Sequence, residues 1–214
     1  MIAIDGPVAS GKTVVGRQLA QRLGYRFIDT GLMYRACTYL ALRDGVAIGD
    51  PDALTALANA TVMDIVVTPQ GERLFTNGED VTAQLRTPEV QALVSNVAKV
   101  AGVRVAMVDQ QQRMAEAGEV VMVGRDIGTK VLPGAGKVYL DASADERVRR
   151  RLSEVAGSET EAEVRANLEL RDKIDSEREE SPLRVADDAV VVLTDALDVE
   201  GVVCAVMAAL SGDA

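Results

Sequence analysis

The chain has 214 residues, which suffices for one sizeable hydrophobic core, so we expect a single domain that carries an insert. It contains no histidine, which excludes Ser-His-Asp and Cys-His nucleophiles, imidazole bases and histidine metal sites. Any catalysis must therefore use Asp, Glu, Lys, Arg, the backbone or a metal ion. The net charge of −10 and the 3% aromatic content argue against binding to nucleic acid or to an anionic membrane.

The basic residues bear on which ligands the protein can bind, and the cysteines on the redox compartment in which it works. Of 23 basic residues, 18 are arginines, whose planar fork suits bidentate contacts with phosphate, although a high-GC genome gives the same excess. Cys37 and Cys204 are too few for a disulfide framework or a structural zinc site, and we interpret both as core residues. The first residues lack a basic start, and no apolar run approaches a membrane-spanning length. We therefore expect a soluble cytoplasmic protein.

The first part of the chain alternates between apolar runs and helical spacing. The run MIAID ends at a glycine and predicts a buried strand, and the spacing of Val15, Leu19 and Leu23 predicts a helix. The expected elements are a strand over 1–5, a helix over 12–23, a strand over 25–29, a helix over 33–43, and a short helix that Asp50-Pro51-Asp52 caps and that ends near Asn59.

The sequence pattern changes after residue 60, where β-branched runs replace the alternation of strands and helices. Two β-branched runs, TVMDIVVT and RLFTNG, flank Pro69-Gln70-Gly71-Glu72, which is a hairpin signal. A further extended piece, VTAQLR, is expected after Asn77-Gly78. We interpret residues 61–90 as a small antiparallel insert in an otherwise alternating α/β chain.

The remaining elements return to the α/β alternation, which predicts a parallel sheet flanked by helices. Residues 158–180 are almost uninterruptedly charged and fit either a solvated helical face or a mobile lid; we take 154–180 as the lid segment. The expected elements are helices from Thr87-Pro88-Glu89 to about Met114 with a break near Gly102, strands over 120–123 and 137–140, a helix that a capping box at 143–146 opens and that runs through Leu152, a strand over 189–193, and a terminal helix after Asp198.

Residues 6–13, GPVASGKT, match the complete phosphate-binding pattern G-x-x-x-x-G-K-[ST]. Glycines let the backbone N–H groups point at phosphate oxygens, the following helix adds its positive N-terminus, Lys12 reaches the β and γ phosphates, and Thr13 offers a hydroxyl to Mg²⁺. An Asn-Lys-x-Asp guanine motif is absent, and motor or transporter ATPases need a longer chain. Among P-loop proteins, the sequence therefore favours a small kinase that uses ATP and Mg²⁺. The expected nucleotide contacts are Gly6, Pro7, Val8, Ala9, Ser10, Gly11, Lys12, Thr13 and Val14.

Three later motifs carry candidate acceptor-binding residues. Residues 29–35, DTGLMYR, follow the second strand and fit either an acceptor pocket or a helix start capped by Thr30. In residues 124–129, GRDIGT, Arg125 could grip an anion while Asp126 accepts from a base amino group, or the two could form an internal ion pair. Arg171, Asp175 and Arg178 share one face of a helix at i, i+4 and i+7, where a solvated ion-pair stripe is the simpler interpretation.

Taken together, these motifs resemble the bacterial cytidylate kinase family along essentially the whole chain. The resemblance rests on IDGPVASGKT, DTGLMYR, NGEDVTAQLRTPEV with the later Ser95 and Arg104, GRDIGT, YLDASADERVRRR and LRDKIDSEREESPL. It implies a transfer of the γ-phosphoryl group of ATP to CMP or dCMP by a monomer, with no macromolecular partner.

The resemblance also implies roles for individual positions. Ser95, Arg104 and Asp126 are similar to residues that read cytosine, and Arg35, Arg125 and Arg178 to a clamp on the acceptor phosphate. Thr30 and Tyr34 would line that pocket, Arg171 and Asp175 would contact the ribose, and Arg150 would lie near ATP. Lys12, Arg125, Arg171 and Arg178 are the implied catalytic set, and the hairpin insert resembles the family's additional acceptor-side domain.

One position departs from the family pattern. Members usually carry Asp or Glu before Gly-Arg-Asp, beside Mg²⁺, whereas this chain has Val123. Either Thr13, phosphates and waters hold the metal alone, or a neighbour such as Asp5 substitutes, and we hypothesise an unusually high requirement for free Mg²⁺. The alternatives to a cytidylate kinase are a P-loop kinase for another monophosphate or small metabolite, and a non-catalytic nucleotide switch.

Overall fold

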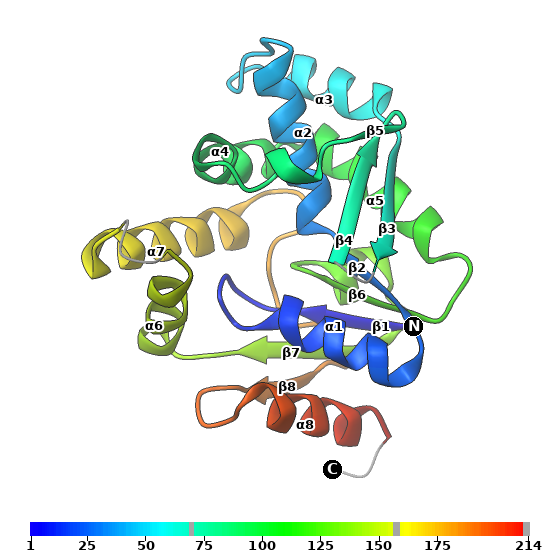
Figure 1. The fold of residues 1–214 in the computed structure, drawn as a ribbon, viewed down its shortest axis with the longest axis vertical. Helices are drawn as coiled ribbons and strands as arrows, with labels where there is room; N and C mark the ends of the chain where they lie inside the picture. The colour runs from blue at the N-terminus through cyan, green and yellow to red at the C-terminus, as the bar shows by residue number, and fades with distance from the viewer. Residues whose placement is uncertain (69–70, 156–158, 212–214) are drawn as a thin grey trace. The chain divides into compact units, whose positions relative to one another are not determined.

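The computed structural model describes residues 1–68, 71–155 and 159–211, and it divides into two compact units (Figure 1). The first unit comprises Met1–Phe27, Glu119–Arg178 and Pro182–Ala214. The second comprises Ile28–Gly118 and Glu179–Ser181. Pro69 and Gln70 of the expected hairpin turn lie outside the described residues.

A five-stranded parallel sheet forms the centre of the first unit, and the α/β prediction is confirmed. Its order is β2-β6-β1-β7-β8, so the chain crosses over between neighbouring strands. Ile4 pairs with Val123 and Asp5 with Gly124, which brings the carboxyl ends of β1 and β6 to the same edge. The strands are β1 (Ile2–Asp5), β2 (Arg26–Asp29, whose last two residues fall in the second unit), β6 (Val120–Gly124), β7 (Gly136–Asp141) and β8 (Val190–Leu193).

Helices α1 and α8 pack on each other and on this sheet, where Leu19, Val203 and Val206 join the buried strand residues in one core (Figure 1). In each helix the spacing of the apolar residues places them on the face that meets the sheet, and their burial stabilises the packing. Helices α6 and α7 pack on each other. The helices of this unit are α1 (Lys12–Leu23), the short π-helix η2 (Ile127–Val131), α6 (Ala144–Val155), α7 (Glu161–Glu177) and α8 (Val199–Ser211).

The second unit has its own core and a three-stranded antiparallel sheet of order β3-β4-β5. The predicted caps are confirmed, because Asp50 accepts from Asp52 N and Ala53 N, and Thr87 accepts from Val90 N. Its elements are α2 (Gly31–Arg43), α3 (Pro51–Ala60), β3 (Met63–Thr68), β4 (Gly71–Thr76), β5 (Glu79–Asp80), the 3₁₀ helix η1 (Thr82–Gln84), α4 (Pro88–Ala98) and α5 (Ala101–Ala115).

Two local predictions are wrong, for reasons that lie in side-chain hydrogen bonds. The piece VTAQLR is not extended, because the Asp80 carboxylate accepts from both the backbone N and the Oγ1 of Thr82 and turns the chain into η1. The capping box at 143–146 is only half formed. Ser143 Oγ accepts from Glu146 N, but the Ser143 N–H donates to the Asp195 carboxylate instead.

The cysteines differ from each other. Cys37 is buried in the core of the second unit, and burial raises the pKa of its thiol to about 12. Cys204 is exposed on α8, so its interpretation as a core residue is wrong. In the described ranges, every helix is too short or too polar to cross a bilayer.

The break between α4 and α5 falls at Lys99 and Val100, two residues before the predicted position. Gly102 lies inside the first turn of α5 and has a packing role. A Cβ placed on Gly102 would lie 2.2 Å from Thr55 Oγ1 of α3, closer than atoms can approach.

We predict that Gly102→Ala destabilises the protein by about 1–3 kcal/mol, because α3 and α5 must move apart to admit the methyl group. Urea unfolding followed by circular dichroism measures the change. The control is Gly49→Ala, whose new Cβ would meet no atom within 4 Å. Equal stability changes in the two variants would contradict the packing role.

Candidate functional site

The phosphate-binding loop follows β1 and leads into α1, as its sequence predicts. Gly6 has φ +152°, and a Cβ there would lie 2.1 Å from the Leu140 carbonyl oxygen, so only glycine fits. Gly11 also has a positive φ, 92°, and precedes the first residue of α1. The loop therefore presents the N-terminus of α1, where the helix dipole and the N–H groups of the first turn attract anions.

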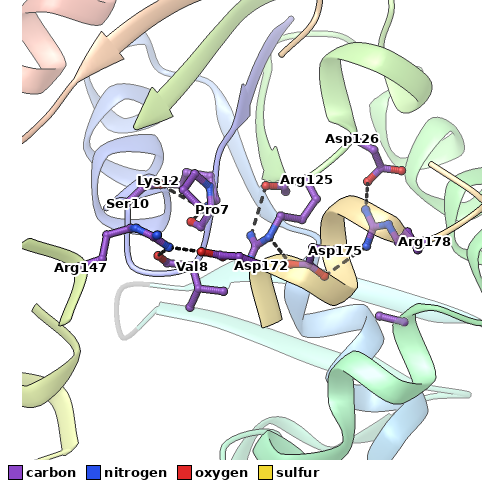
Figure 2. A network of polar contacts seen from close by, with 12 residues as sticks. Pro7, Val8, Ser10, Lys12, Arg125, Asp126, Arg147, Asp172, Asp175 and Arg178 are labelled. Atoms are coloured by element: carbon purple, nitrogen blue, oxygen red, sulfur yellow. Dashed lines mark hydrogen bonds and ion pairs between the residues drawn. The ribbon is translucent and has the colours of Figure 1, made fainter. Parts of the chain in front are cut away.

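Lys12 lies across this loop in the described structure (Figure 2). Its Nζ donates to the Pro7 carbonyl oxygen at 2.5 Å and to Ser10 Oγ at 3.2 Å, and the side chain is buried. A bound phosphate would compete with these two neutral acceptors for the ammonium group.

A pocket of about 400 Å³ opens beside the loop in the first unit. Arg150 is fixed on its wall, because Nε donates to Glu146 at 2.8 Å while both terminal nitrogens donate to Thr194 at 2.9 Å. Apolar side chains such as Val15 and Leu197 share the lining with these polar groups, a mixture that suits a nucleotide base and ribose. Of the predicted nucleotide contacts, the pocket is lined by Ala9, Ser10, Gly11, Val14 and Arg150.

Sequence reasoning missed the contribution of Thr194 and Leu197 to this pocket. They follow β8, the edge strand of the sheet, and carry no motif. The only available signal was their place after a strand, since ligands bind beyond the carboxyl ends of parallel strands.

The buried carboxylate of Asp175 organises a further polar cluster in the first unit (Figure 2). Arg125 Nε donates to one of its oxygens at 2.8 Å, and Arg178 approaches the other at 3.5 Å. A terminal nitrogen of Arg178 lies 3.9 Å from Asp126 Oδ1. Burial would raise the pKa of Asp175, but the charges of Arg125 and Arg178 outweigh it and hold the pKa below its ordinary value. Arg171 lies close enough to act in the same direction.

These contacts correct two sequence-based interpretations. Arg125 pairs with Asp175 rather than with its neighbour Asp126, so the internal Arg-Asp pair does not form. Arg178 does not share a helix face with Asp175, because α7 ends at Glu177 and Arg178 has extended backbone angles of −63° and 141°. The cluster is buried, with Asp175 at 6% and Arg178 at 8% exposure, so it is no solvated stripe.

The second unit holds the remaining predicted acceptor residues, just before α2 and on α2, α4 and α5. Arg104 is 1% exposed; its guanidinium carbon lies 5.1 Å from the Tyr34 ring centroid, and one nitrogen donates to the Ala98 carbonyl oxygen. Arg35 donates weakly to the Leu85 carbonyl oxygen at 3.5 Å. Thr30 and Ser95 are buried. Arg104 and Tyr34 are thus brought together by stacking, which the sequence did not predict.

Thr30 precedes α2 but does not cap it through its side chain. The neighbouring carboxylate of Asp29 does so instead, since it accepts from Gly31 N at 3.0 Å. The interpretation of Thr30 as a plain helix cap is therefore wrong.

Asp5 and Val123 are the two positions at which the sequence raises the question of a metal ligand. Asp5 is buried and both of its oxygens are already bonded, to Ile127 N at 2.9 Å and Gly128 N at 2.7 Å. Val123 is 1% exposed, and a Cβ on Gly16 would lie 2.5 Å from it, so it packs against α1. Among the described residues, no group of three or more Cys, Asp or Glu side chains could hold a metal ion.

Comparison with known proteins gives close relatives over nearly the full length. Residues 2–211 match the family described as cytidylate kinase. The chain is 50% identical over 206 residues to a cytidylate kinase of Bacillus licheniformis, covering 94% of this chain and 91% of the relative. It is also 50% identical over 210 residues to a cytidylate kinase of Geobacillus thermodenitrificans, with 96% and 94% covered.

Among solved structures, an uncharacterized protein from Eubacterium ventriosum has a TM-score of 0.56 at 14% identity, with 98% of this chain and 97% of that chain covered. This likeness concerns the fold alone.

The Asp5 carboxyl gives a pH-dependent prediction. Burial raises its pKa from 3.8 to about 6, although the Gly128 and Ile127 N–H groups act against the rise. Because the pKa of Asp5 is higher in the folded than in the unfolded state, the protonated carboxyl stabilises the folded protein. This contribution to the free energy of unfolding is complete below pH 3.8 and is lost as the pH rises through 6. The change corresponds to roughly 3 kcal/mol. Asp5→Asn lacks this loss, so its stability relative to wild type, from urea unfolding, should rise by about that amount between pH 4 and 7. Parallel pH profiles would refute the assignment.

Proposed function

Because the chain belongs to the cytidylate kinase family, whose members are nucleoside monophosphate kinases that use ATP, we propose that it transfers the γ-phosphoryl group of ATP to CMP or dCMP. The products are ADP and CDP or dCDP. The observation that supports the proposal most is the buried cluster of Arg125, Asp175 and Arg178, which provides arginines for an acceptor phosphate in the same unit as a complete P-loop.

The loop and its pocket are proposed to bind ATP. Backbone N–H groups of residues 6–13 and the N-terminus of α1 cradle the phosphates, and Lys12 exchanges its contacts with Pro7 and Ser10 for phosphate oxygens. The pocket beside Arg150 accepts the adenosine. Because the fixed guanidinium of Arg150 needs no reorganisation, it contributes a preorganised positive charge.

The structure's donor groups fit a magnesium ion held mainly by the nucleotide. The Thr13 hydroxyl, at the first turn of α1, is the protein ligand that we propose, while both Asp5 oxygens are committed to backbone N–H groups. When bound, Mg²⁺ neutralises charge on the β and γ phosphates. Phosphate oxygens and waters would supply most of its remaining ligands.

The acceptor residues divide by chemistry. We assign the acceptor phosphate to Arg35, Arg125 and Arg178, since guanidinium forks pair well with phosphate. Cytosine would be read by Ser95, Arg104 and Asp126, with the Asp126 carboxylate accepting from the exocyclic amino group. Thr30 and Tyr34 would also contact the acceptor, and Arg171 and Asp175 would contact the ribose.

Phosphoryl transfer to an acceptor that is already an anion needs no general base, so a protein without histidine can perform it. Lys12, Arg125, Arg171 and Arg178 would align the donor and the acceptor and stabilise charge in a loose transition state. Water must be excluded, and segment 154–180 is proposed as the lid that closes over the reaction. Residues 61–90 remain the proposed acceptor-side insert of one kinase domain, and we expect a cytoplasmic monomer.

The proposal predicts the outcome of an acceptor panel. Steady-state rates with CMP, dCMP, UMP and AMP, at saturating ATP and excess Mg²⁺, should give kcat/KM values for CMP and dCMP at least about 100-fold above that for AMP, because an unmatched base leaves buried polar groups unpaired. A preference for AMP would favour a different monophosphate kinase. Release of inorganic phosphate without CDP formation in a single turnover would favour a nucleotide switch.

Val123 gives a second prediction. In Val123→Asp a carboxylate at the end of β6 adds a hard oxygen ligand, so the free Mg²⁺ concentration for half-maximal rate should fall by about 5-fold or more. Val123→Asn, similar in size but uncharged, is the control and should change little. An identical Mg²⁺ dependence in wild type and Val123→Asp would contradict the hypothesis of a weakened metal site.

A further inference from the structure

One guanidinium group connects the phosphate-binding loop to α7 (Figure 2). Arg147 NH1, from α6, donates to the Val8 carbonyl oxygen at 3.3 Å and to Asp172 Oδ2 of α7 at 2.5 Å. We propose that Arg147 and Asp172 are positioning residues that couple ATP binding in the loop to acceptor binding by α7. The inference rests on the proposed function and adds two residues that lie within the quoted motifs but had no role assigned to them.

The side chain of Val8 supports the same connection. It packs against an apolar cluster of Val148 from α6 and Val164 and Leu168 from α7. Val8 is therefore held to the helix pair twice, by its carbonyl oxygen through Arg147 and by its side chain through apolar contact. A displacement of Val8 when phosphates bind would therefore alter one or both of these contacts.

The Arg147–Asp172 pair uses only part of its hydrogen-bonding capacity. The side chains are 13% and 23% exposed, yet Arg147 Nε and Asp172 Oδ1 are buried with no hydrogen-bond partner among the described residues. Buried polar atoms are normally satisfied, so two unsatisfied atoms in one pair call for an explanation. A bidentate pairing, which the guanidinium fork allows, would satisfy both at once. Such a pairing requires the fork to turn toward Asp172 and to release Val8, and it is the second arrangement on which the proposed coupling relies.

Helix α7 carries a change at Asp172 to the acceptor cluster. Asp172 and Asp175 are three residues apart, about 4.5 Å along the axis, within one helix. A capping box formed by Thr160 and Glu163 secures the other end of α7, so the helix can move as a unit. Asp175 holds Arg125 and Arg178, the residues proposed for the acceptor phosphate. Displacement of Asp172 therefore shifts the clamp.

A second ion pair between the same helices provides a control. Arg165 of α7 lies 2.9 Å from Asp145 of α6, and its described bonds go only to Asp145 and Glu161, never to the loop. If Arg147 and Asp172 merely held α6 against α7, losing either pair would have similar consequences. If they couple the loop to the clamp, only the pair that reaches Val8 matters for coupling.

The test is calorimetric titration of the full-length protein with CMP, with and without saturating non-hydrolysable ATP analogue and Mg²⁺. The ratio of the two dissociation constants is the coupling factor. We expect about 10-fold tighter CMP binding with the analogue in wild type, and a factor below about 2 in Asp172→Asn. Asp145→Asn should retain the wild-type factor. CMP affinity without the analogue should change less than about 3-fold in both variants, a split that a purely structural role would not produce.

Arg147→Lys is a second test variant. Its ammonium group can keep one contact but cannot form a bidentate pair with Asp172, so this variant should also lose coupling. If Asp172→Asn does not fold, Arg147→Lys still tests whether the pair couples the two binding sites. Wild-type coupling retained in Asp172→Asn or Arg147→Lys, or lost equally in Asp145→Asn, would overturn the inference. So would a wild-type coupling factor of one. If wild type binds no CMP under either condition, the proposed function fails as well, a result distinct from binding without coupling.

Discussion

The ionised carboxylate of Asp175 is the constraint on which the candidate acceptor site depends. It is buried, and two arginines balance the cost of removing its charge from water. Its loss would remove the carboxylate that pairs with both Arg125 and Arg178, and breaking a buried pair typically costs about 3–5 kcal/mol. The same carboxylate fixes the orientation of both guanidinium groups before any ligand arrives. Preorganised charge of this kind is what phosphoryl transfer requires, because the reaction needs alignment and charge neutralisation rather than proton transfer.

The parallel sheet gathers these groups from distant parts of the chain. β1 and β6 are neighbours in register, so the loop after Asp5 and the Gly124-Arg125-Asp126 segment begin at the same edge. Asp5 fastens the two segments, since its carboxylate accepts from Ile127 N and Gly128 N. The order of strands in the sheet, rather than any single motif, therefore brings the phosphate cradle and the arginine cluster into one unit.

The sequence predicts what local patterns determine and misses what distant side chains decide. The P-loop, the parallel strands and the caps at Asp50 and Thr87 follow from residue order alone, and the structure confirms them. The half-formed capping box could not be predicted, because Asp195 lies 52 residues from the Ser143 N–H that it binds. The pairing of Arg125 with Asp175 across 50 residues is equally non-local. The residue roles assigned to the acceptor site stay predictions, since they come from motif resemblance.

The arginine cluster organised by Asp175 is proposed to bind the acceptor phosphate. Calorimetric dissociation constants for CMP and for cytidine, in wild type and in Arg178→Ala, test it most directly because the two ligands differ only in the phosphate. Wild type should bind CMP at least about 100-fold more tightly than cytidine, and Arg178→Ala should reduce that ratio by about 10-fold or more. A variant that weakens CMP and cytidine by the same factor would contradict the claim.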